Sequence, residues 1–147
     1  MKGAVMRMGV VVLLIVILML ASPVLAETRG IGLSAGVMDG DFAVQLGKDF
    51  RLGGDISQIS GGFEVCFQNK TTFRVDADYH FVIKSGEGRF YPLAGVQFAF
   101  TSKNAEFGIN AGGGVNFMFT ESLAGFAEGK WVFSDWDGLA VYAGIYF

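Results

Sequence analysis

The sequence predicts an all-β protein: an eight-stranded antiparallel up-and-down β-barrel that spans a membrane and is preceded by an N-terminal signal peptide. Three observations support this fold class. The first is an apolar N-terminal segment with the layout of an export signal. The second is a period of two in hydrophobicity along the rest of the chain, and the third is a series of evenly spaced turn sequences.

The N-terminal segment has a positively charged start, an unbroken apolar run from Val10 to Leu20, and a following stretch of small and aliphatic residues. This is the layout of a secretory signal peptide, here with cleavage before Glu27. The alternative is an uncleaved anchor, because the apolar stretch approaches the roughly 20 residues of a membrane-spanning helix. Pro23 favours cleavage. We therefore predict a signal peptide at residues 1–26 and a barrel domain at residues 27–147.

The barrel strands are predicted from alternation of apolar and polar residues. It is clearest between residues 73 and 83, where Phe73 and Val75 share one face while Arg74 and Asp76 share the other. Successive side chains of a strand point to opposite faces, so this segment reads as one long amphipathic strand. The same alternation recurs, in chain order, at residues 42–46, 63–67, 90–100, 107–119 and 139–147.

Turn sequences rich in Gly, Asp, Asn and Ser separate these runs. Their centres lie near residues 40, 54, 70, 86, 103, 121 and 136, a spacing of 14 to 18 residues. Seven turns imply eight strands joined as consecutive hairpins. No segment with a helical period and no linker interrupts the series, which indicates a single domain.

The polar face of these strands is a poor water-facing surface. It carries many glycines, which suit the crowded interior of an eight-stranded barrel. Eleven residues tilted by about 40° rise roughly 27 Å, close to the apolar band of about 25 Å of a membrane barrel. We therefore expect the apolar face to point outward to lipid. A soluble barrel that binds an apolar ligand also alternates, and it remains an alternative.

The chain ends in Ile145, Tyr146 and Phe147, which complete an amphipathic strand. With the signal sequence and eight strands, this ending resembles the small eight-stranded outer-membrane β-barrels of bacteria, typified by the OmpA membrane domain, OmpX and the opacity-type proteins. The resemblance implies a monomer in the outer membrane of a bacterium with two membranes. It implies contact with membrane lipid and lipopolysaccharide, and recognition by the barrel-assembly machinery through the C-terminal strand that ends at Phe147.

Composition excludes several classes of protein. The 11 Lys and Arg residues do not outnumber the 14 Asp and Glu residues, so there is no basic excess for nucleic-acid binding. One Cys excludes an internal disulfide framework, and one His excludes a two-histidine metal site. We predict no cofactor, no metal and no catalytic residue.

Strand parity points a set of charged residues into the barrel. One interpretation is a catalytic or conducting group, with Asp76, Asp78 and His80 as an acid–base cluster. The other, which we favour, is a structural network that fills the lumen, because charges inside a narrow barrel must pair across strands. The predicted network comprises Asp49, Arg51, Glu64, Arg74, Asp76, Asp78, His80, Glu128 and Lys130.

The function favoured by these observations is a structural role in the envelope with a mostly occluded lumen. The alternatives are a narrow porin-like channel for water or small ions and a lipid-modifying enzyme. Outer-membrane lipid A deacylases and palmitoyltransferases pair a His with a nearby Ser, whereas the nearest Ser after His80 is Ser85, in a turn. The turns near residues 40, 70, 103 and 136, which would face outside, are short, which disfavours an adhesin.

Aromatic residues near the strand ends predict a girdle at the membrane interfaces. We expect Trp131, Phe133, Trp136 and Tyr91 to belong to it. Tyr142 and Tyr146 fall on the inward parity and are expected to fill the barrel instead.

Overall fold

A computed structural model describes residues 28–52, 56–67, 71–86, 88–135 and 138–147, with side chains described from Ile31 onward. The predicted signal peptide, residues 1–26, lies outside them. Within the described part of the chain, no helix has the length and apolar character needed to cross a membrane. The strands are β1 (Thr28–Met38), β2 (Asp41–Arg51), β3 (Ser57–Phe67), β4 (Thr72–Phe81), β5 (Ile83–Ser85), β6 (Gly88–Phe100), β7 (Ala105–Met118), β8 (Ala124–Phe133) and β9 (Gly138–Tyr146).

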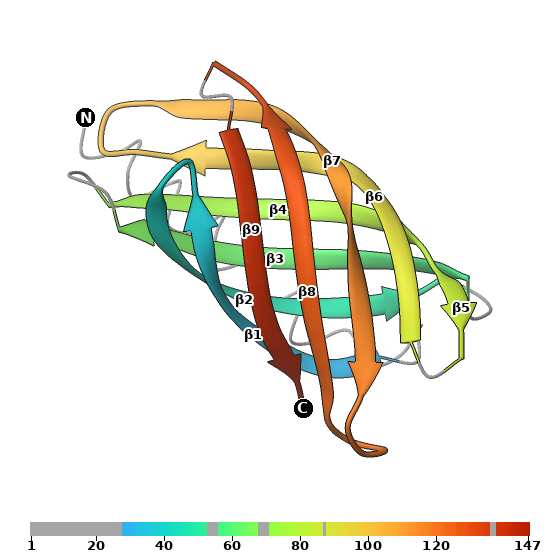
Figure 1. The fold of residues 1–147 in the computed structure, drawn as a ribbon. Coiled ribbons are helices and arrows are strands. Elements are labelled where there is room, and N and C mark those ends of the chain that lie inside the picture. Colours follow the sequence, from blue (N-terminus) through green and yellow to red (C-terminus); the bar gives the residue numbers. More distant parts are fainter. Residues whose placement is uncertain (1–27, 53–55, 68–70, 87, 136–137) are drawn as a thin grey trace.

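The strands form one closed antiparallel sheet. Each strand pairs with its neighbour in sequence except β4 and β5, which both pair with β6, and β1 pairs with β9. The first and last strands therefore lie side by side, and the tilted strands wrap around a common axis (Figure 1). The backbone amides of Ile31 and Phe147 each donate to the carbonyl of the other, at 3.0 and 3.1 Å. The predicted eight-stranded up-and-down barrel is confirmed, because β4 and β5 are two parts of one strand.

The uninterrupted strand predicted for residues 73–83 is wrong at Val82. His80 pairs with Leu93 and Ile83 pairs with Phe90, so β4 and β5 share one register along β6. The interruption lies beside Pro92, which has no amide hydrogen to donate to the ladder. The Val82 amide still donates to the carbonyl of Ile56 across the β3 side, at 2.8 Å. The barrel wall therefore stays continuous on one side of the interruption.

The apolar face points outward. Phe73 and Phe98 are each 45% exposed and Phe117 is 41% exposed, although these are large hydrophobic side chains. Charged and amide side chains of the same strands are buried inside, as Asp76, Gln97 and Asn116 illustrate. This distribution is the reverse of that in a soluble protein, in which the large apolar side chains gather inside.

The structure tests the predicted aromatic girdle only in the direction in which its side chains point. Trp131 and Phe133 point outward and are about half exposed, whereas Trp136 lies outside the described residues. The prediction for Tyr91 is wrong, because its side chain is 2% exposed and lies in the lumen. Its neighbours Phe90 and Pro92 point outward, so strict alternation along β6 sends Tyr91 inward.

The barrel has two rims, which differ in their turns. The terminal rim carries Ile31, Phe147 and the turns after β2, β5 and β7; the opposite rim carries the turns after β1, β3, β6 and β8. The first turn of the opposite rim is the two-residue Asp39–Gly40, with φ values of 49° and 90°. Positive φ at both positions matches the right-handed twist of a hairpin. At this rim, two to four residues of sequence separate the consecutive strands.

Candidate functional site

The structure places the predicted charged residues in the lumen. Eight of the nine are buried, and Arg51, near the end of β2, is partly exposed. They come from β2, β3, β4 and β8, whose inward faces meet because the sheet closes. The buried residues are Asp49, Glu64, Arg74, Asp76, Asp78, His80, Glu128 and Lys130.

Lys130 is the centre of the network and is 2% exposed. Its Nζ lies 2.5 Å from Asp76 Oδ2 and 2.8 Å from Asp78 Oδ2, both on β4. Glu128 Oε1, on the same strand as Lys130, is 3.9 Å away. We call Lys130, Asp76 and Asp78 the lysine clasp. It joins β8 to β4 across the interior, so it links opposite sides of the wall.

Neutral amides complete the clasp. Gln45 Nε2 on β2 donates to Asp76 Oδ2 at 3.0 Å, and Asn110 Nδ2 on β7 donates to Asp78 Oδ1 at 2.9 Å. Each clasp carboxylate therefore has a charged partner and a neutral partner. A buried ion pair offsets its loss of hydration only when further hydrogen bonds satisfy its atoms, and this arrangement supplies them.

A second group fills the half of the lumen toward the opposite rim. Arg74 Nη1 lies 3.0 Å from Glu64 Oε1, which pairs two residues directly opposite on β4 and β3. The Tyr142 hydroxyl donates to Glu64, and Cys66 Sγ lies 3.0 Å from Glu64 Oε1 and 3.3 Å from Arg74 Nη1. Arg74 also contacts Met38. An apolar cluster surrounds this group: Met38, Ala43, Cys66, Val132, Ala140 and Tyr142.

Aromatic side chains fill the half toward the terminal rim. The His80 and Tyr91 rings stack with centroids 4.4 Å apart, and the Tyr91 hydroxyl donates to Glu128 Oε2 at 3.0 Å. The Phe126 and Tyr146 centroids are 4.7 Å apart, and the Tyr146 hydroxyl lies 3.3 Å from Asp49 Oδ1. Strand parity identifies Tyr142 and Tyr146 as inward, but it does not show that these hydroxyls bond to lumen carboxylates.

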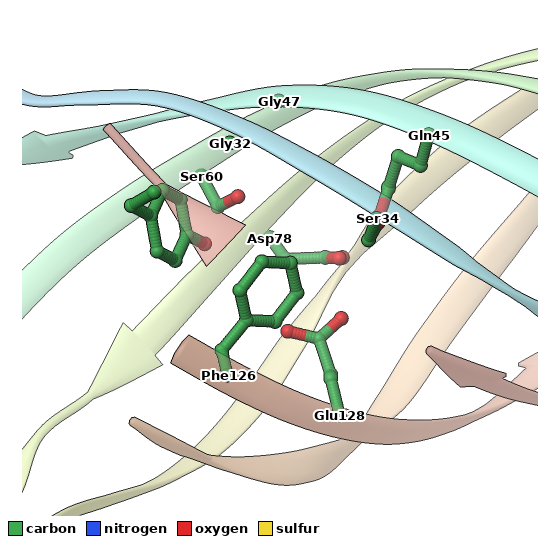
Figure 2. A pocket seen from close by; sticks show the side chains of 9 residues that line it. Gly32, Ser34, Gln45, Gly47, Ser60, Asp78, Phe126 and Glu128 are labelled. Carbon is green, nitrogen blue, oxygen red and sulfur yellow. The ribbon is translucent and has the colours of Figure 1, made fainter. Parts of the chain in front are cut away.

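A small pocket lies between the aromatic side chains and the clasp (Figure 2). Its volume is about 10 Å³, roughly the smallest cavity that can hold one water molecule. Figure 2 shows Ser60, Asp78 and Glu128 around it, with Phe126 on one side. Its lining comprises Gly32, Ser34, Gln45, Gly47, Ser60, Asp78, Phe126, Glu128 and Tyr146. The pocket admits a water molecule but no larger solute.

The lumen also contains the single histidine of the chain, His80. His80 stacks on Tyr91 inside the barrel and Ser85 is exposed, so this pair is not assembled. Across the described residues, no group of three or more His, Cys, Asp or Glu side chains is arranged to hold a metal ion. Among the residues that the structure describes, acidic side chains are in excess in the interior, because five buried carboxylates face two buried basic side chains, Arg74 and Lys130.

Comparisons with known proteins agree with this fold. No protein-family model matches the chain, and no curated protein matches its sequence. Among solved structures, the N-terminal β-barrel domain of Pseudomonas aeruginosa OprF is similar with a TM-score of 0.72 and 12% identity, covering 83% of this chain and 97% of that one. Neisserial surface protein A is similar with a TM-score of 0.63 and 10% identity, covering 81% and 93%.

The outer membrane enzyme PagL is also similar, with a TM-score of 0.55 and 11% identity over 79% of this chain and 96% of that one. At these identities the similarity shows the fold, which is that of the small eight-stranded outer-membrane barrels. The resemblance inferred from the sequence is thus confirmed for the fold. PagL shows that this fold can carry an enzyme, so the fold alone does not decide the activity.

Proposed function

We propose that this chain is an integral outer-membrane protein of a bacterium with two membranes, with a structural role in the envelope. The observation that carries the proposal is the inverted distribution of side chains: aromatic and aliphatic residues outside, a charged and hydrogen-bonded network inside. Transferring each large apolar side chain from water to lipid is favourable by roughly 1.5–3 kcal/mol. A closed barrel also leaves no unpaired strand edge in the lipid.

The filled lumen supports a structural role rather than that of a channel. The lysine clasp crosses the interior between β8 and β4, and the pocket beside it has room for about one water molecule. The short turns at the opposite rim offer little surface to a protein partner. We propose that the chain is monomeric, that its partners are membrane lipid and lipopolysaccharide, and that the barrel-assembly machinery recognises the strand ending at Phe147.

Gel mobility and fractionation test the membrane assignment. The folded chain should migrate differently before and after boiling in dodecyl sulfate, and it should co-purify with the outer membrane. An assembly-blocked variant, Ala111→Arg, is the matched control, because it places a charge on the outward face of β7. Full solubility of the folded chain in water without detergent would overturn the assignment.

Envelope permeability tests the structural role. Cells that lack the protein should become more sensitive to detergents and large antibiotics, and the native chain should restore resistance where the Ala111→Arg variant does not. Unchanged sensitivity in the deletion strain would remove the scaffold role while leaving the membrane assignment intact.

The second candidate function is a narrow channel for water or small cations. The excess of buried carboxylates over buried basic side chains favours it, because such a lumen attracts cations. The scaffold proposal expects no single-channel current in planar bilayers from either the native chain or a Lys130→Gln variant. A cation-selective current that changes in the variant would establish the channel instead.

A further inference from the structure

The outward face of the described strands carries one charged side chain among the residues whose side chains the structure describes. It belongs to Lys48 on β2, which is partly exposed and lies between Gly47 and Asp49. Asp49 is buried in the lumen, so the alternation of the strand directs Lys48 to the outside. A lysine on this face is costly at the centre of a bilayer and is tolerated near its interfaces. The ammonium group therefore needs a polar partner at an interface.

The ammonium group of Lys48 points toward the terminal rim. Its Nζ lies 5.7 Å from the centroid of the Phe50 ring. Phe50 is the next outward residue of β2 and lies closer to the end of the strand at Arg51. The apolar stem thus runs along the wall and carries the charge toward the membrane surface. The ion pairs within the described part of the chain involve Arg74 and Lys130, so no carboxylate there neutralises Lys48.

Two hydroxyl groups lie at the same level of the wall. Phe50 is directly opposite Ile59 on β3, and Ile59 is directly opposite Tyr79 on β4. Tyr79 points outward and is 43% exposed. Its hydroxyl oxygen lies 2.6 Å from Ser57 Oγ, and Ser57 is two residues from Ile59 in the direction of the terminal rim. The side chains of Lys48 and Tyr79 therefore both extend toward this rim, from the strands on either side of Ser57.

The three side chains supply hydrogen-bond donors. In the pair formed by Tyr79 and Ser57, one hydroxyl donates to the other, and the accepting hydroxyl keeps its own hydrogen for a further partner. Lys48 adds three N–H donors and a positive charge. The row of residues from β2 to β4 spans two strand spacings, about 10 Å, and long side chains reach toward its middle from both ends. A negatively charged acceptor matches these groups, and phosphate oxygens are such acceptors.

We propose that Lys48, Tyr79 and Ser57 bind the phosphate group of a membrane glycerophospholipid at the terminal rim. The donors lie on the outward wall beside apolar side chains, of which Ile59 is 37% and Phe81 46% exposed. The acyl chains of a lipid can cover these side chains while its phosphate meets the donors. An anionic phospholipid fits best, because the charge of Lys48 is not neutralised. This inference rests on the proposed membrane function.

Native mass spectrometry of lipid binding tests the site. The folded barrel in dodecyl maltoside, a detergent without phosphate, is titrated with phosphatidylglycerol. A Lys48→Gln variant should bind the lipid at least about tenfold more weakly, since it loses a charge-assisted hydrogen bond. Lys103→Gln, in an exposed turn of the opposite rim, is the matched control and should bind like the native chain. Heat-modifiable mobility, measured first, shows that each variant is folded.

Two further variants separate recognition of the phosphate from a general effect on the wall. Lys48→Arg keeps the charge and should restore most of the affinity that Lys48→Gln loses. Tyr79→Phe should weaken binding about fivefold, the value of one neutral hydrogen bond. Equal affinity of the native chain and Lys48→Gln would overturn the site. The membrane assignment would still stand, because it fails only if the folded chain is soluble without detergent.

Other ligands establish which phosphate the site takes. The native chain should prefer phosphatidylglycerol to zwitterionic phosphatidylcholine, and Lys48→Gln should lose that preference, because Lys48 supplies the charge. No preference in the native chain would refute recognition through Lys48. An excess of inorganic phosphate should leave the lipid bound, since the acyl chains also contribute to binding. Displacement by inorganic phosphate would identify a site for the free ion and overturn the assignment to a lipid.

Discussion

At the scale of single residues, Lys130 shows how a charged lumen can be stable. Its ammonium group has lost its water and is held by Asp76 and Asp78, which are themselves bound by amides from two other strands. Replacing such a group by apolar residues can be neutral, whereas removing one partner leaves buried charges uncompensated. Replacing Lys130 is therefore expected to destabilise the barrel more than replacing any other residue of the lumen.

We expect Lys130→Met to lower the free energy of unfolding by about 3–5 kcal/mol, since two carboxylates lose their cation. Equilibrium urea unfolding in lipid vesicles, followed by tryptophan fluorescence, measures the change. Lys103→Met, in an exposed turn, is the matched control and should have little effect. Adding Asp76→Asn and Asp78→Asn should recover part of the loss; no recovery would contradict the pairing.

Two adjacent residues of β7 test which face meets lipid. Ala111 points outward, and Asn110 is buried and donates to Asp78. Ala111→Arg should cost about 2–4 kcal/mol near the bilayer centre and block assembly. Asn110→Ser should cost only about 1 kcal/mol, the value of one hydrogen bond. The yield of heat-modifiable barrel measures both, and equal effects would mean that the faces are reversed.

At the scale of strands, glycines set how closely the inward faces approach. A Cβ at Gly95 on β6 would contact Asp78 and the carbonyl of Ala77, with Asp78 Cα only 2.6 Å away. A Cβ at Gly129 on β8 would meet nothing within 4 Å. The two positions therefore differ in the room that they leave for a side chain, and not in their backbone conformation.

Gly95→Ala should destabilise the barrel by about 1–3 kcal/mol, because the extra carbon overpacks the β4–β6 contact beside the lysine clasp. Gly129→Ala should be neutral or stabilising by up to about 1 kcal/mol. Urea midpoints of the two variants in the same vesicles make the comparison. A larger loss at Gly129 would contradict the assigned faces.

The strands also show what the sequence could and could not predict. Alternation alone predicts which side of β4 carries Arg74, Asp76 and Asp78, because strand geometry fixes it. It does not predict that Lys130 reaches both aspartates, because that contact depends on how the sheet curves and closes. The interruption at Val82 was missed for a related reason: Pro92, which lies beside it, is on another strand.

Parity predicts some of the contacts among the lumen residues and not others. Arg74 and Glu64 pair across neighbouring strands, as parity allows. The hydroxyl contacts of Tyr91 and Tyr142 with buried carboxylates were not predicted, since an inward tyrosine gives no sign of its partner in sequence. Gln58 lies on the inward face of a weakly alternating strand and was missed.

At the scale of the whole molecule, the two rims should lie on opposite sides of the membrane. Because the wall consists of an even number of membrane-crossing strands, the start of β1 and the end of β9 both lie at the terminal rim. The turns at Lys103 and Ser122 therefore belong to different rims. A peptide tag inserted after Lys103 should be detected by antibody on intact cells. A tag after Ser122 should be detected only after the outer membrane is permeabilised; the reverse pattern would invert the topology.

The pairing of β1 with β9 has a consequence for how the protein is made. The first and last strands of the barrel hydrogen-bond to each other, so the barrel cannot close until β9 has been synthesised. Until the final strand is available, β1 offers a bare edge that invites aggregation. Closure of the barrel therefore waits for the last strand, because β9 is the strand that covers the free edge of β1.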